Sequence, residues 1–301
     1  MSAGVEIDVA GRHLTLSNLD KVLYPCGFTK SQVIDYMARI APIAIPHLAG
    51  RCLTFRRYPN GTDTAGFFEK RCPGHRPEWV QVALGPGDRQ GGIEYCRIEE
   101  IAAMVWAANM AAIEIHAPMA RSVDLAVPGA LVFDFDPGAP ATIVECCQIA
   151  VAARDVLESV DLQAWCKTSG SKGLQMYVPL NTSEATHEGA ADFALAVGQV
   201  LERQLPGRVT TVMAKAERPG KIFVDWSQNA FHKTTIAPYS LRARPDPTVS
   251  TPVTWGEVES CADGGIMLRF TSDEVLARVE QHGDLFAEVL SLEQVLPIPG
   301  R

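Results

Sequence analysis

Apolar residues recur every three or four positions in several long segments of the chain, which is the spacing of one face of an α-helix. In the first segment, residues 29–48, Thr29 or Ser31 can cap the helix and Val33 and Met37 lie on its apolar face. The same spacing predicts further helices over residues 98–112, 143–160 and 187–204. The last fifty residues are also predicted to be helical, with an acidic surface.

Shorter apolar runs bounded by turn residues predict β-strands. They are an N-terminal strand pair at residues 5–18 and the segments 52–59, 112–118, 131–136, 165–180 (strand, tight loop, strand) and 221–227. Strands and helices mix without a regular βαβ rhythm. The expected fold class is therefore α/β (α+β), with mixed or antiparallel sheets flanked by helices.

The run LVFDFDPG, residues 131–138, places two carboxylates at the end of an apolar strand. Asp134 and Asp136 are separated by one residue, so their side chains point to the same face, about 6–7 Å apart at Cα. Two unpaired carboxylates so close repel each other unless a cation lies between them. A pair of divalent ions roughly 3.5–4 Å apart suits this geometry and is the usual apparatus of nucleotidyl transfer. A simple turn at Asp-Pro-Gly is the alternative.

Two further segments could complete such a site. Asp225 ends the apolar strand of KIFVDWSQN, and an acid from a second strand could join a metal cluster. The loop TSGSKG, residues 168–173, combines the positive Lys172 with small residues whose backbone N–H groups can converge on a triphosphate. The loop lacks the spacing of a Walker A motif. A solvated strand end and a plain hairpin turn are the respective alternatives.

Phe67 and Phe68 are neighbours beside Lys70, so a strand would turn them to opposite sides of its sheet. A sheet covered on one side would bury only one ring, and the exposed ring could stack on a nucleobase. Packing of both rings in the core is the alternative. Taken alone, His116 is expected to be an ordinary core or strand histidine.

Composition narrows the class of protein. The 301 residues are 47% hydrophobic and 21% charged, which is a globular composition with enough apolar material for a large core. No apolar run reaches the roughly 18 residues of a membrane span, and the N-terminus lacks the order of a secretory signal. The eight cysteines follow no regular framework, so we expect buried or idle thiols, although Cys72-Pro-Gly-His75 has the spacing of half a zinc site. A cytoplasmic location follows.

The net charge of −8 argues at first against a nucleic-acid partner, but the charges are segregated. Residues 51–76 carry six Lys/Arg against two acids, and residues 205–245 carry seven against two. From residue 257 onward there are nine acids and three bases. Two basic segments could therefore meet a polyanion, and solvated basic faces are the alternative.

Several long motifs in order resemble one known family. LVFDFDPG, TSGSKGLQMYVPL, and GKIFVDWSQN followed by KTTIAPYSLRAR are similar to the polymerase domain of bacterial DNA ligase D, in the archaeo-eukaryotic primase superfamily. LTLSNLDKVLYP, RRYPNGTDTAGFFEK and EIHAP fit in the same order, and the resemblance runs from about residue 14 to 290. It implies a single domain over residues 1–301, made of two fused, interleaved lobes with a primase-like catalytic core between them.

The resemblance also implies roles for individual residues. Asp134, Asp136 and Asp225 would be catalytic and would hold two divalent ions, Mn²⁺ or Mg²⁺, with manganese favoured. The implied nucleotide-binding residues are Arg56, His116, Ser169, Ser171, Lys172, Gln175, Arg218, Gln228, Arg242 and Arg244. The implied DNA-binding residues are Asn18, Lys21 and Lys30, for a 5′-phosphate, and Phe67, Phe68 and Lys70, for template bases.

Gln175 departs from the family, which usually has histidine at this position. Glutamine can donate a hydrogen bond but carries no charge, so tight triphosphate binding, or its pH dependence, is expected to differ. The carboxylates are intact. Motifs of a ligase or phosphoesterase are missing from this sequence, and we expect a stand-alone enzyme rather than an excised domain.

The expected function is that of a template-directed primase-polymerase. It would fill short gaps that have a downstream 5′-phosphate, in DNA repair or non-homologous end joining, by two-metal nucleotidyl transfer with ribonucleotides preferred. The expected partners are gapped or broken DNA, NTP or dNTP, a DNA ligase and end-binding repair proteins, without a membrane. The expected location is the bacterial nucleoid.

Three other functions were weighed. A non-catalytic module that binds DNA ends or gaps predicts phosphate-dependent binding without nucleotide incorporation, with Gln175 marking lost activity. A D-x-D glycosyltransferase would leave Lys21 and the Asp225 strand unexplained. A phosphatase of the D-x-D-x-[TV] type is excluded, because Gly138 occupies the Thr/Val position.

Overall fold

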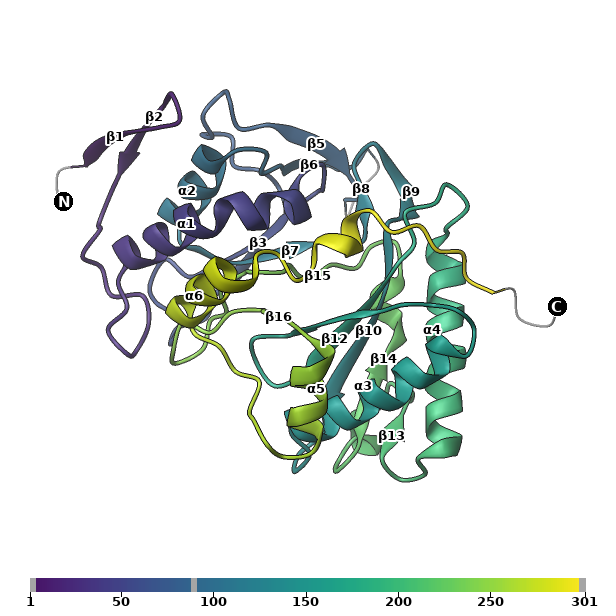
Figure 1. Cartoon of the computed structure of the whole chain (residues 1–301). Helices are drawn as coiled ribbons and strands as arrows, with labels where there is room; N and C mark the ends of the chain where they lie inside the picture. The colour runs from purple at the N-terminus through teal and green to yellow at the C-terminus, as the bar shows by residue number, and fades with distance from the viewer. Residues whose placement is uncertain (1–3, 88–90, 298–301) are drawn as a thin grey trace. The chain divides into compact units, whose positions relative to one another are not determined.

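The structure is a computed structural model that describes residues 4–87 and 91–297. Contacts between Cα atoms divide the chain into two compact units, each assembled from three separate segments. The first unit comprises Met1–Pro118, Ile236–Ser250 and Phe270–Gly283, and the second comprises Met119–Thr235, Thr251–Arg269 and Asp284–Arg301. Each unit is described by itself, with the elements labelled in Figure 1.

The first unit contains one long helix, α1, and two shorter helices, α2 and α6, together with a four-stranded sheet in the order β15-β7-β3-β4. Two hairpins, β1–β2 and β5–β6, complete it. Helix α1 begins with a capping box between Thr29 and Gln32 and buries Val33, Met37 and Ile40. The elements of this unit are β1 (Val5–Val9), β2 (Arg12–Leu16), α1 (Lys30–Leu48), β3 (Thr54–Arg57), β4 (Phe67–Glu69), β5 (Val82–Gly85), β6 (Ile93–Cys96), α2 (Ile101–Asn109), β7 (Ala112–Ala117), α6 (Ser272–His282) and, at its border, β15 (Thr235–Ile236).

The second unit is built on a six-stranded sheet in the order β13-β14-β10-β12-β11-β16. Neighbouring strands are antiparallel, except that β13 and β14 are parallel. The elements of this unit are β8 (Ala120–Arg121), β9 (Asp124–Pro128), β10 (Ala130–Pro137), α3 (Ile143–Glu158), β11 (Trp165–Thr168), β12 (Leu174–Pro179), α4 (His187–Gln204), β13 (Val209–Thr210), η1 (Lys215–Glu217), β14 (Ile222–Asp225), η2 (Trp226–Asn229), β16 (Pro252–Val253), α5 (Trp255–Ala262) and η3 (Ala287–Leu290).

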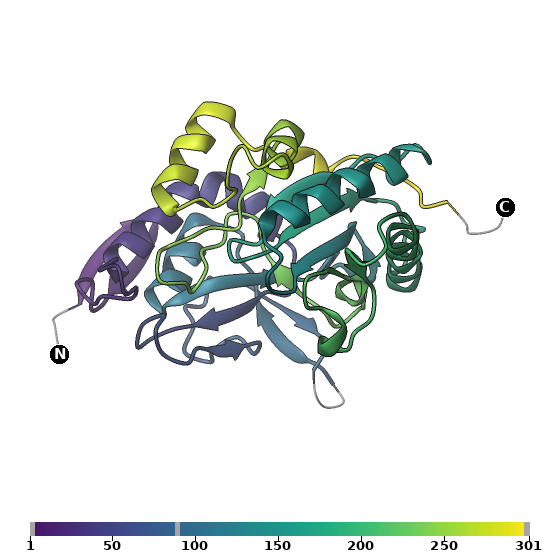
Figure 2. The same ribbon diagram turned by 90° about the horizontal axis from the view of Figure 1, so that it is seen from below.

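The central strand β10 separates an apolar face from a polar one. Phe133 and Phe135 are completely buried on the face that α3 and α4 cover, and Gly198 of α4 approaches Val224 of β14 there. Figures 1 and 2 show α3 lying along this sheet. On the opposite face, Val132 is buried in a small cluster with residues of η3, and the next residues of that face toward the end of β10 are the aspartates.

The predicted elements and fold class are confirmed, with two differences in extent. Helix α2 is shorter than the predicted 98–112, because its flanks are a strand and an extended segment. The last fifty residues are only partly helical: α5, α6 and η3 are joined by irregular stretches. The described helices include none that is long and apolar enough to cross a membrane.

One cysteine pair was missed from the sequence. Cys72 and Cys96, 24 residues apart, form a disulfide in the first unit, so the expectation of buried or idle thiols was wrong for these two residues. No spacing signal links them. The N–H of Cys72 donates to the carbonyl of Glu94 in β6, the strand that ends at Cys96. The other six cysteines agree with the expectation of idle thiols: five are buried, and Cys26 is exposed.

Candidate active site

One row of side chains crosses the six-stranded sheet and contains two of the predicted carboxylates. Asp225 on β14 is the Cα partner of Asp134 on β10, and Asp134 is the partner of Gln175 on β12. Gln175 pairs in turn with Lys167 on β11. Directly paired residues of antiparallel strands project to the same face, so these four side chains form a continuous row. Asp136 lies on this face as well, two residues after Asp134.

The inner end of the row is a buried ammonium group. Lys167 has no exposed surface, and Gln175 is 3% exposed. The Nζ of Lys167 donates a hydrogen bond of 2.6 Å to Gln175 Oε1. Since its oxygen is engaged with the lysine, Gln175 donates from its amide nitrogen to Asp134. Gln175, predicted to bind nucleotide, therefore connects a positive charge to Asp134, a predicted catalytic carboxylate.

The carboxyl group of Asp134 has a strongly raised pKa. Burial raises its pKa to about 7, with the negative charges of Asp136 and Asp225 adding to the shift and the groups of Gln175 and Lys167 opposing it. Several negative charges in one half-buried place disfavour ionisation. A cation among the carboxylates would remove this penalty, so the row is electrostatically suited to bind one.

Asp225 lies where β14 ends and the chain turns into η2. Its Oδ1 accepts from the backbone N–H of Ser227 at 3.1 Å and from the hydroxyl of Ser227 at 2.6 Å. Its Oδ2 accepts from Nε2 of Gln228 at 2.9 Å. The predicted site residue Gln228 is thus in direct contact with a predicted metal ligand.

Asn229 fixes the alignment of β14 with β10. It is 1% exposed, and its Oδ1 accepts from the N–H of Val132 while its Nδ2 donates to the carbonyl of Val132, both at 2.8 Å. Its side chain therefore occupies the place beside β10 that a further residue of β14 would take. This arrangement keeps Asp225 opposite Asp134.

The Pro-Gly that follows the aspartates is explained by the close approach of another segment. A Cβ on Gly138 would lie 1.9 Å from the carbonyl oxygen of Arg218, so a larger residue does not fit. The N–H of Gly138 donates to the carbonyl of Lys221 at 2.8 Å. Arg218 is thereby held beside the end of β10, with its guanidinium 3.7 Å from the centre of the Phe223 ring. Within the described part of the chain, its buried Nε has no hydrogen-bond partner.

The loop TSGSKG joins β11 to β12 and is closed by its own serine. Ser169 Oγ accepts from the N–H groups of Ser171 at 3.3 Å and Gly173 at 3.0 Å. Two of the N–H groups expected to cradle a phosphate are thus satisfied within the loop. A Cβ on Gly173 would lie 3.5 Å from Asp136 Oδ1, so the loop is adjacent to the carboxylates. Lys172 is exposed in this loop.

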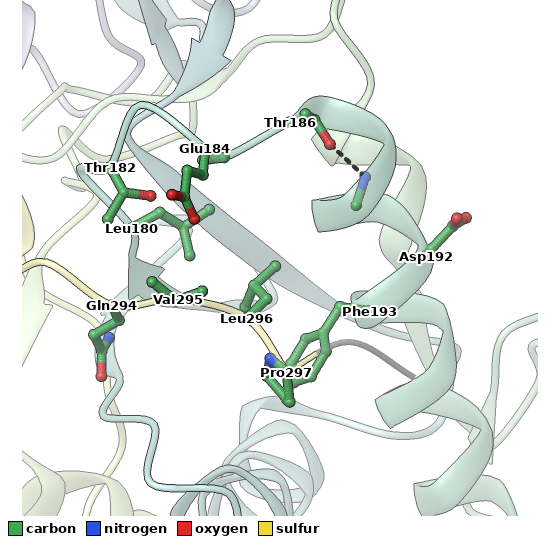
Figure 3. Close-up of a pocket in the computed structure, with 12 residues that line it drawn as sticks. Leu180, Thr182, Glu184, Thr186, Asp192, Phe193, Gln294, Val295, Leu296 and Pro297 are labelled. Atoms are coloured by element: carbon green, nitrogen blue, oxygen red, sulfur yellow. Dashed lines mark hydrogen bonds between the residues drawn. The ribbon is translucent and has the colours of Figure 1, made fainter. Parts of the chain in front are cut away.

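Two cavities are present in the second unit. One of about 300 Å³ adjoins the loop and is lined by Pro137, Thr168 and the segments 141–143, 170–173 and 267–269. The other, of about 330 Å³, is lined mainly by apolar side chains such as Leu180, Phe193 and Val295, which converge from three segments (Figure 3). The described residues that line the second cavity include none of the predicted site residues. The first cavity is therefore the one that belongs to the candidate site.

The donor set of the three aspartates fits divalent ions, because Mg²⁺ and Mn²⁺ prefer carboxylate oxygens. Burial and the charges of Asp136 and Asp225 raise the pKa of Asp134, so a bound cation would favour its ionised form. In the described part of the chain, however, no group of three or more acidic, histidine or cysteine side chains is already arranged to hold a metal ion. The strands gather the carboxylates on one face, while Asp225 stays bonded to Ser227 and Gln228.

In the first unit, three predicted nucleotide-binding residues meet at a buried carboxylate that the sequence analysis did not single out. Glu114 on β7 is 2% exposed and is the Cα partner of Arg56 on β3. Its Oε2 lies 3.1 Å from His116 Nε2 and 3.6 Å from Arg56 Nη1. Its Oε1 lies 3.2 Å from Arg242 Nε. These four residues are called the Glu114 cluster below.

The ionisation of the Glu114 cluster follows from its geometry. Burial alone would raise the pKa of Glu114, but the hydrogen bond from His116 and the charge of Arg242 lower it to about 2. Burial lowers the pKa of His116, against the effect of Glu114, so the ring is neutral at pH 7. A carboxylate can only accept, and the proton of the ring is therefore on Nε2. Arg244 follows, with its N–H donating to the carbonyl of Arg242 at 2.9 Å.

Phe67 and Phe68 are both exposed, by 46% and 58%, so the expectation that one ring is buried was wrong. They lie on β4, a three-residue strand at the edge of its sheet, where each ring covers the arginine opposite it on β3. The guanidinium of Arg57 lies 5.4 Å from the centre of Phe67, and that of Arg56 lies 5.2 Å from the centre of Phe68. Phe68 also meets His116 edge-on at 5.6 Å.

The residues predicted to hold a 5′-phosphate come together ahead of α1. The N–H of Lys21 donates to the carbonyl of Asn18, and the N–H of Lys30 donates to the carbonyl of Lys21. Lys30 is 5% exposed, and its Nζ donates to the carbonyl of Ser17 at 2.7 Å. Burial lowers the pKa of Lys30 to about 8, and the charges of Lys21 and Arg57 contribute. An anion bound here would counter that shift.

The structure thus divides the predicted site residues between the units. The first unit holds Asn18, Lys21, Lys30, Arg56, Phe67, Phe68, Lys70, His116, Arg242 and Arg244, and the second holds Asp134, Asp136, Ser169, Ser171, Lys172, Gln175, Arg218, Asp225 and Gln228. Lys70 is exposed just after β4. Glu114 and Lys167 were missed, although each is a charged residue inside a predicted strand, which is a usable signal for a buried ionic group.

Comparisons with known proteins show the family of this chain. The family model of the LigD primase-polymerase domain matches residues 29–286. The multifunctional non-homologous end joining DNA repair protein LigD of Mycobacterium tuberculosis is 43% identical over 285 residues, which are 91% of this chain and 36% of that protein. The bifunctional LigD of Bacillus subtilis is 30% identical over 286 residues, 95% of this chain and 45% of that protein. The chain therefore spans less than half the length of these relatives.

The fold agrees as well. The polymerase domain of Mycobacterium tuberculosis ligase D, solved in complex with DNA, superposes with a TM-score of 0.85 at 40% sequence identity and covers 93% of this chain and 99% of that domain. Nucleotidyl transfer is the enzyme class that these findings show. The chain belongs to the family of LigD primase-polymerase domains.

Proposed function

We propose that this chain is a template-directed polymerase that fills short gaps in broken DNA during non-homologous end joining. In this proposal its substrates are DNA with a downstream 5′-phosphate and nucleoside triphosphates, with ribonucleotides preferred. A DNA ligase and end-binding proteins would act beside it at the bacterial nucleoid. The end-joining names of the relatives and the DNA complex of the similar structure support this assignment.

The single observation that carries the proposal is the pairing of Asp225 with Asp134. It places carboxylates from two strands on one face, beside Asp136 and the TSGSKG loop. Burial and the neighbouring carboxylates raise the pKa of Asp134, so a cation would stabilise the ionised form of the row. A site of this kind, with a basic loop next to an acidic row, suits a metal-bound triphosphate.

Asp134, Asp136 and Asp225 would hold two Mn²⁺ or Mg²⁺ ions. When bound, the ions would lower the pKa of the primer 3′-hydroxyl and stabilise the leaving pyrophosphate. Gln175 keeps Asp134 oriented through its link to Lys167. The other residues of the site would position the substrate.

Further predicted site residues would bind the other parts of the substrate. Lys172 in the loop and Arg218 beside β10 provide positive charge for phosphate groups. Phe68 offers an exposed ring to a template base. Lys30, with its nearby Lys21, offers a donor to a 5′-phosphate, which would raise the lowered pKa of the lysine.

The test is primer extension on a gapped duplex. The wild-type chain is given NTPs or dNTPs with Mn²⁺ or Mg²⁺, on gaps that end in a 5′-phosphate or a 5′-hydroxyl. We expect template-matched extension, faster with the 5′-phosphate, and none with Asp134→Ala. Phosphate-dependent DNA binding without any extension would instead establish a non-catalytic end-binding module.

A further inference from the structure

Glu114 collects basic groups from three parts of the first unit. Arg56 comes from β3, His116 from β7, and Arg242 from the segment that follows β15. The backbone N–H of Ala243 also donates to Glu114 Oε1, at 3.1 Å. Both oxygens of one buried side chain are thus shared among four nitrogen-bearing groups.

We propose that Glu114 is a positioning residue that holds Arg56, His116 and Arg242 as one preformed surface for the triphosphate of the incoming nucleotide. This inference rests on the proposed function, which supplies the triphosphate. Glu114 itself is too deeply buried to meet the substrate. It acts through the three basic residues.

Burial of Glu114 is difficult to explain by stability alone. A buried ion pair often contributes no more to stability than apolar residues of similar volume would, and Glu114 shares its face of β7 with Ala112 and His116, while Ile113 and Ile115 project to the other face. Without Glu114, the guanidinium groups of Arg56 and Arg242 would repel each other and turn toward water. The carboxylate of Glu114 therefore influences the positions of these two guanidinium groups.

Two guanidinium groups accompany one carboxylate in the Glu114 cluster, while burial lowers the pKa of His116. The rings of Tyr58 and Phe68 each lie 5.2 Å from the guanidinium of Arg56 and restrict its orientation. Groups that are fixed before binding lose less conformational freedom when an anion arrives, which favours affinity.

Glu99 provides a matched comparison in the same unit. It accepts from Arg97 Nε at 2.7 Å and from the backbone N–H of Gly50 at 2.9 Å, so it combines an ion pair with a backbone hydrogen bond as Glu114 does. Arg97 is not among the predicted nucleotide-binding residues. Glu99→Gln therefore makes the same chemical change away from the proposed surface.

The experiment measures binding and turnover on the whole chain. Isothermal calorimetry without DNA gives the Kd of inorganic triphosphate, of ATP and of AMP, and gap filling gives KM and kcat for the nucleotide. For Glu114→Gln we expect Kd of triphosphate and KM to rise about 10-fold, as for other residues that orient a binding group, while kcat changes by less than about threefold. The Kd of AMP should change much less, and Glu99→Gln should leave all values within about twofold.

Three outcomes overturn the proposal. A folded Glu114→Gln that binds triphosphate as well as the wild type, or more tightly, shows that the carboxylate does not position the basic groups. If that variant does not fold, Glu114→Asp keeps the charge but withdraws it by one methylene, and wild-type binding by this variant would also contradict the role. A wild-type chain that binds no triphosphate overturns it as well. A chain that binds triphosphate but extends no primer overturns only the proposed function.

Discussion

The two units each contain a carboxyl group in a cross-strand row of a sheet, and the two groups are perturbed in opposite directions. In the first unit, basic neighbours lower the pKa of Glu114 to about 2 in spite of burial. In the second, burial and two further aspartates raise the pKa of Asp134 to about 7. Both groups are carboxyl groups on strands. The difference lies in the charges that surround each of them.

The contrast is between a carboxylate that is paired with basic groups and one that lies among other carboxylates. Glu114 already has its cations, so the surface around it is ready for an anion. Asp134 is linked to the positive charge of Lys167 through Gln175 but lies beside two further aspartates, so the surface around it is suited to cations. A metal-bound triphosphate carries both kinds of charge. Variants that remove one charge from each unit can test the contrast directly.

The largest effect is expected from Asp134→Asn. An amide oxygen is a much weaker ligand than a carboxylate, so extension of a gapped duplex should fall by at least about 100-fold, more than the usual loss when only a supporting residue is changed. Asp192→Asn, on the exposed surface of α4, is the control and should extend normally. Retention of activity within about tenfold would mean that Asp134 is not a metal ligand.

The two carboxyl groups should also give the stability of the protein opposite dependences on pH. The lowered pKa of Glu114 contributes up to about 3 kcal/mol above pH 5, which is lost as pH falls toward 2. The raised pKa of Asp134 means that the folded state keeps a proton that the unfolded state has lost, so its contribution falls as pH rises from about 4 to about 7.

Urea unfolding in a metal chelator measures both effects. The deficit of Glu114→Gln relative to the wild type should be greatest at pH 7.5 and shrink in acid. Asp134→Asn should gain stability over the wild type as pH rises, because it has no charge to bury. Parallel curves for the wild type and either variant would show that the corresponding group is not perturbed as described.

A smaller effect is expected from Lys167→Met. The change leaves Gln175 Oε1 without its donor and removes the buried charge nearest to the carboxylate row, so metal-free stability at pH 8 should fall by about 1–3 kcal/mol. The loss should be smaller at pH 5, where Asp134 is protonated. Lys221→Met, which removes a partly exposed lysine of the same unit, is the control. An equally stable Lys167→Met would mean that burial of the ammonium cancels its benefit.

Phe68→Ala should weaken binding of a single-stranded template by about 1–3 kcal/mol, the usual value of one base stacked on an aromatic ring. Fluorescence anisotropy with a labelled overhang measures the change. Phe231→Ala removes another exposed ring, 45% against 58% for Phe68, from the second unit and should have no effect on template binding. Equal losses in both variants would indicate general destabilisation rather than stacking.

Much of the fold could be predicted because local signals were strong. Helical spacing located α1, α3 and α4, and short apolar runs located β10 and β12. The placement of Asp134 and Asp136 on one face followed from the two-residue period of a strand. What the sequence could not supply was strand order, since Asp225 faces Asp134 through a pairing of residues that are 91 positions apart in the chain.

The missed residues share a physical reason. Glu114 and Lys167 are charged residues in apolar strands, and their importance appears only when partners from other segments are known. The exposure of both Phe67 and Phe68 depends on β4 being a short edge strand, which no local pattern shows. The disulfide of Cys72 and Cys96 was hidden for the same reason, because it joins two segments that are not neighbours in the chain.

The double hydrogen bond of Asn229 with Val132 has a consequence for how much the site tolerates change. A slip of β14 by one residue would turn the acid of this strand to the side covered by helices, and a slip by two would move it to another rung. Only one alignment lets the amide satisfy both main-chain groups of Val132. Asn229 would therefore keep Asp225, the predicted catalytic acid, opposite Asp134 even if the length of the preceding turn changed.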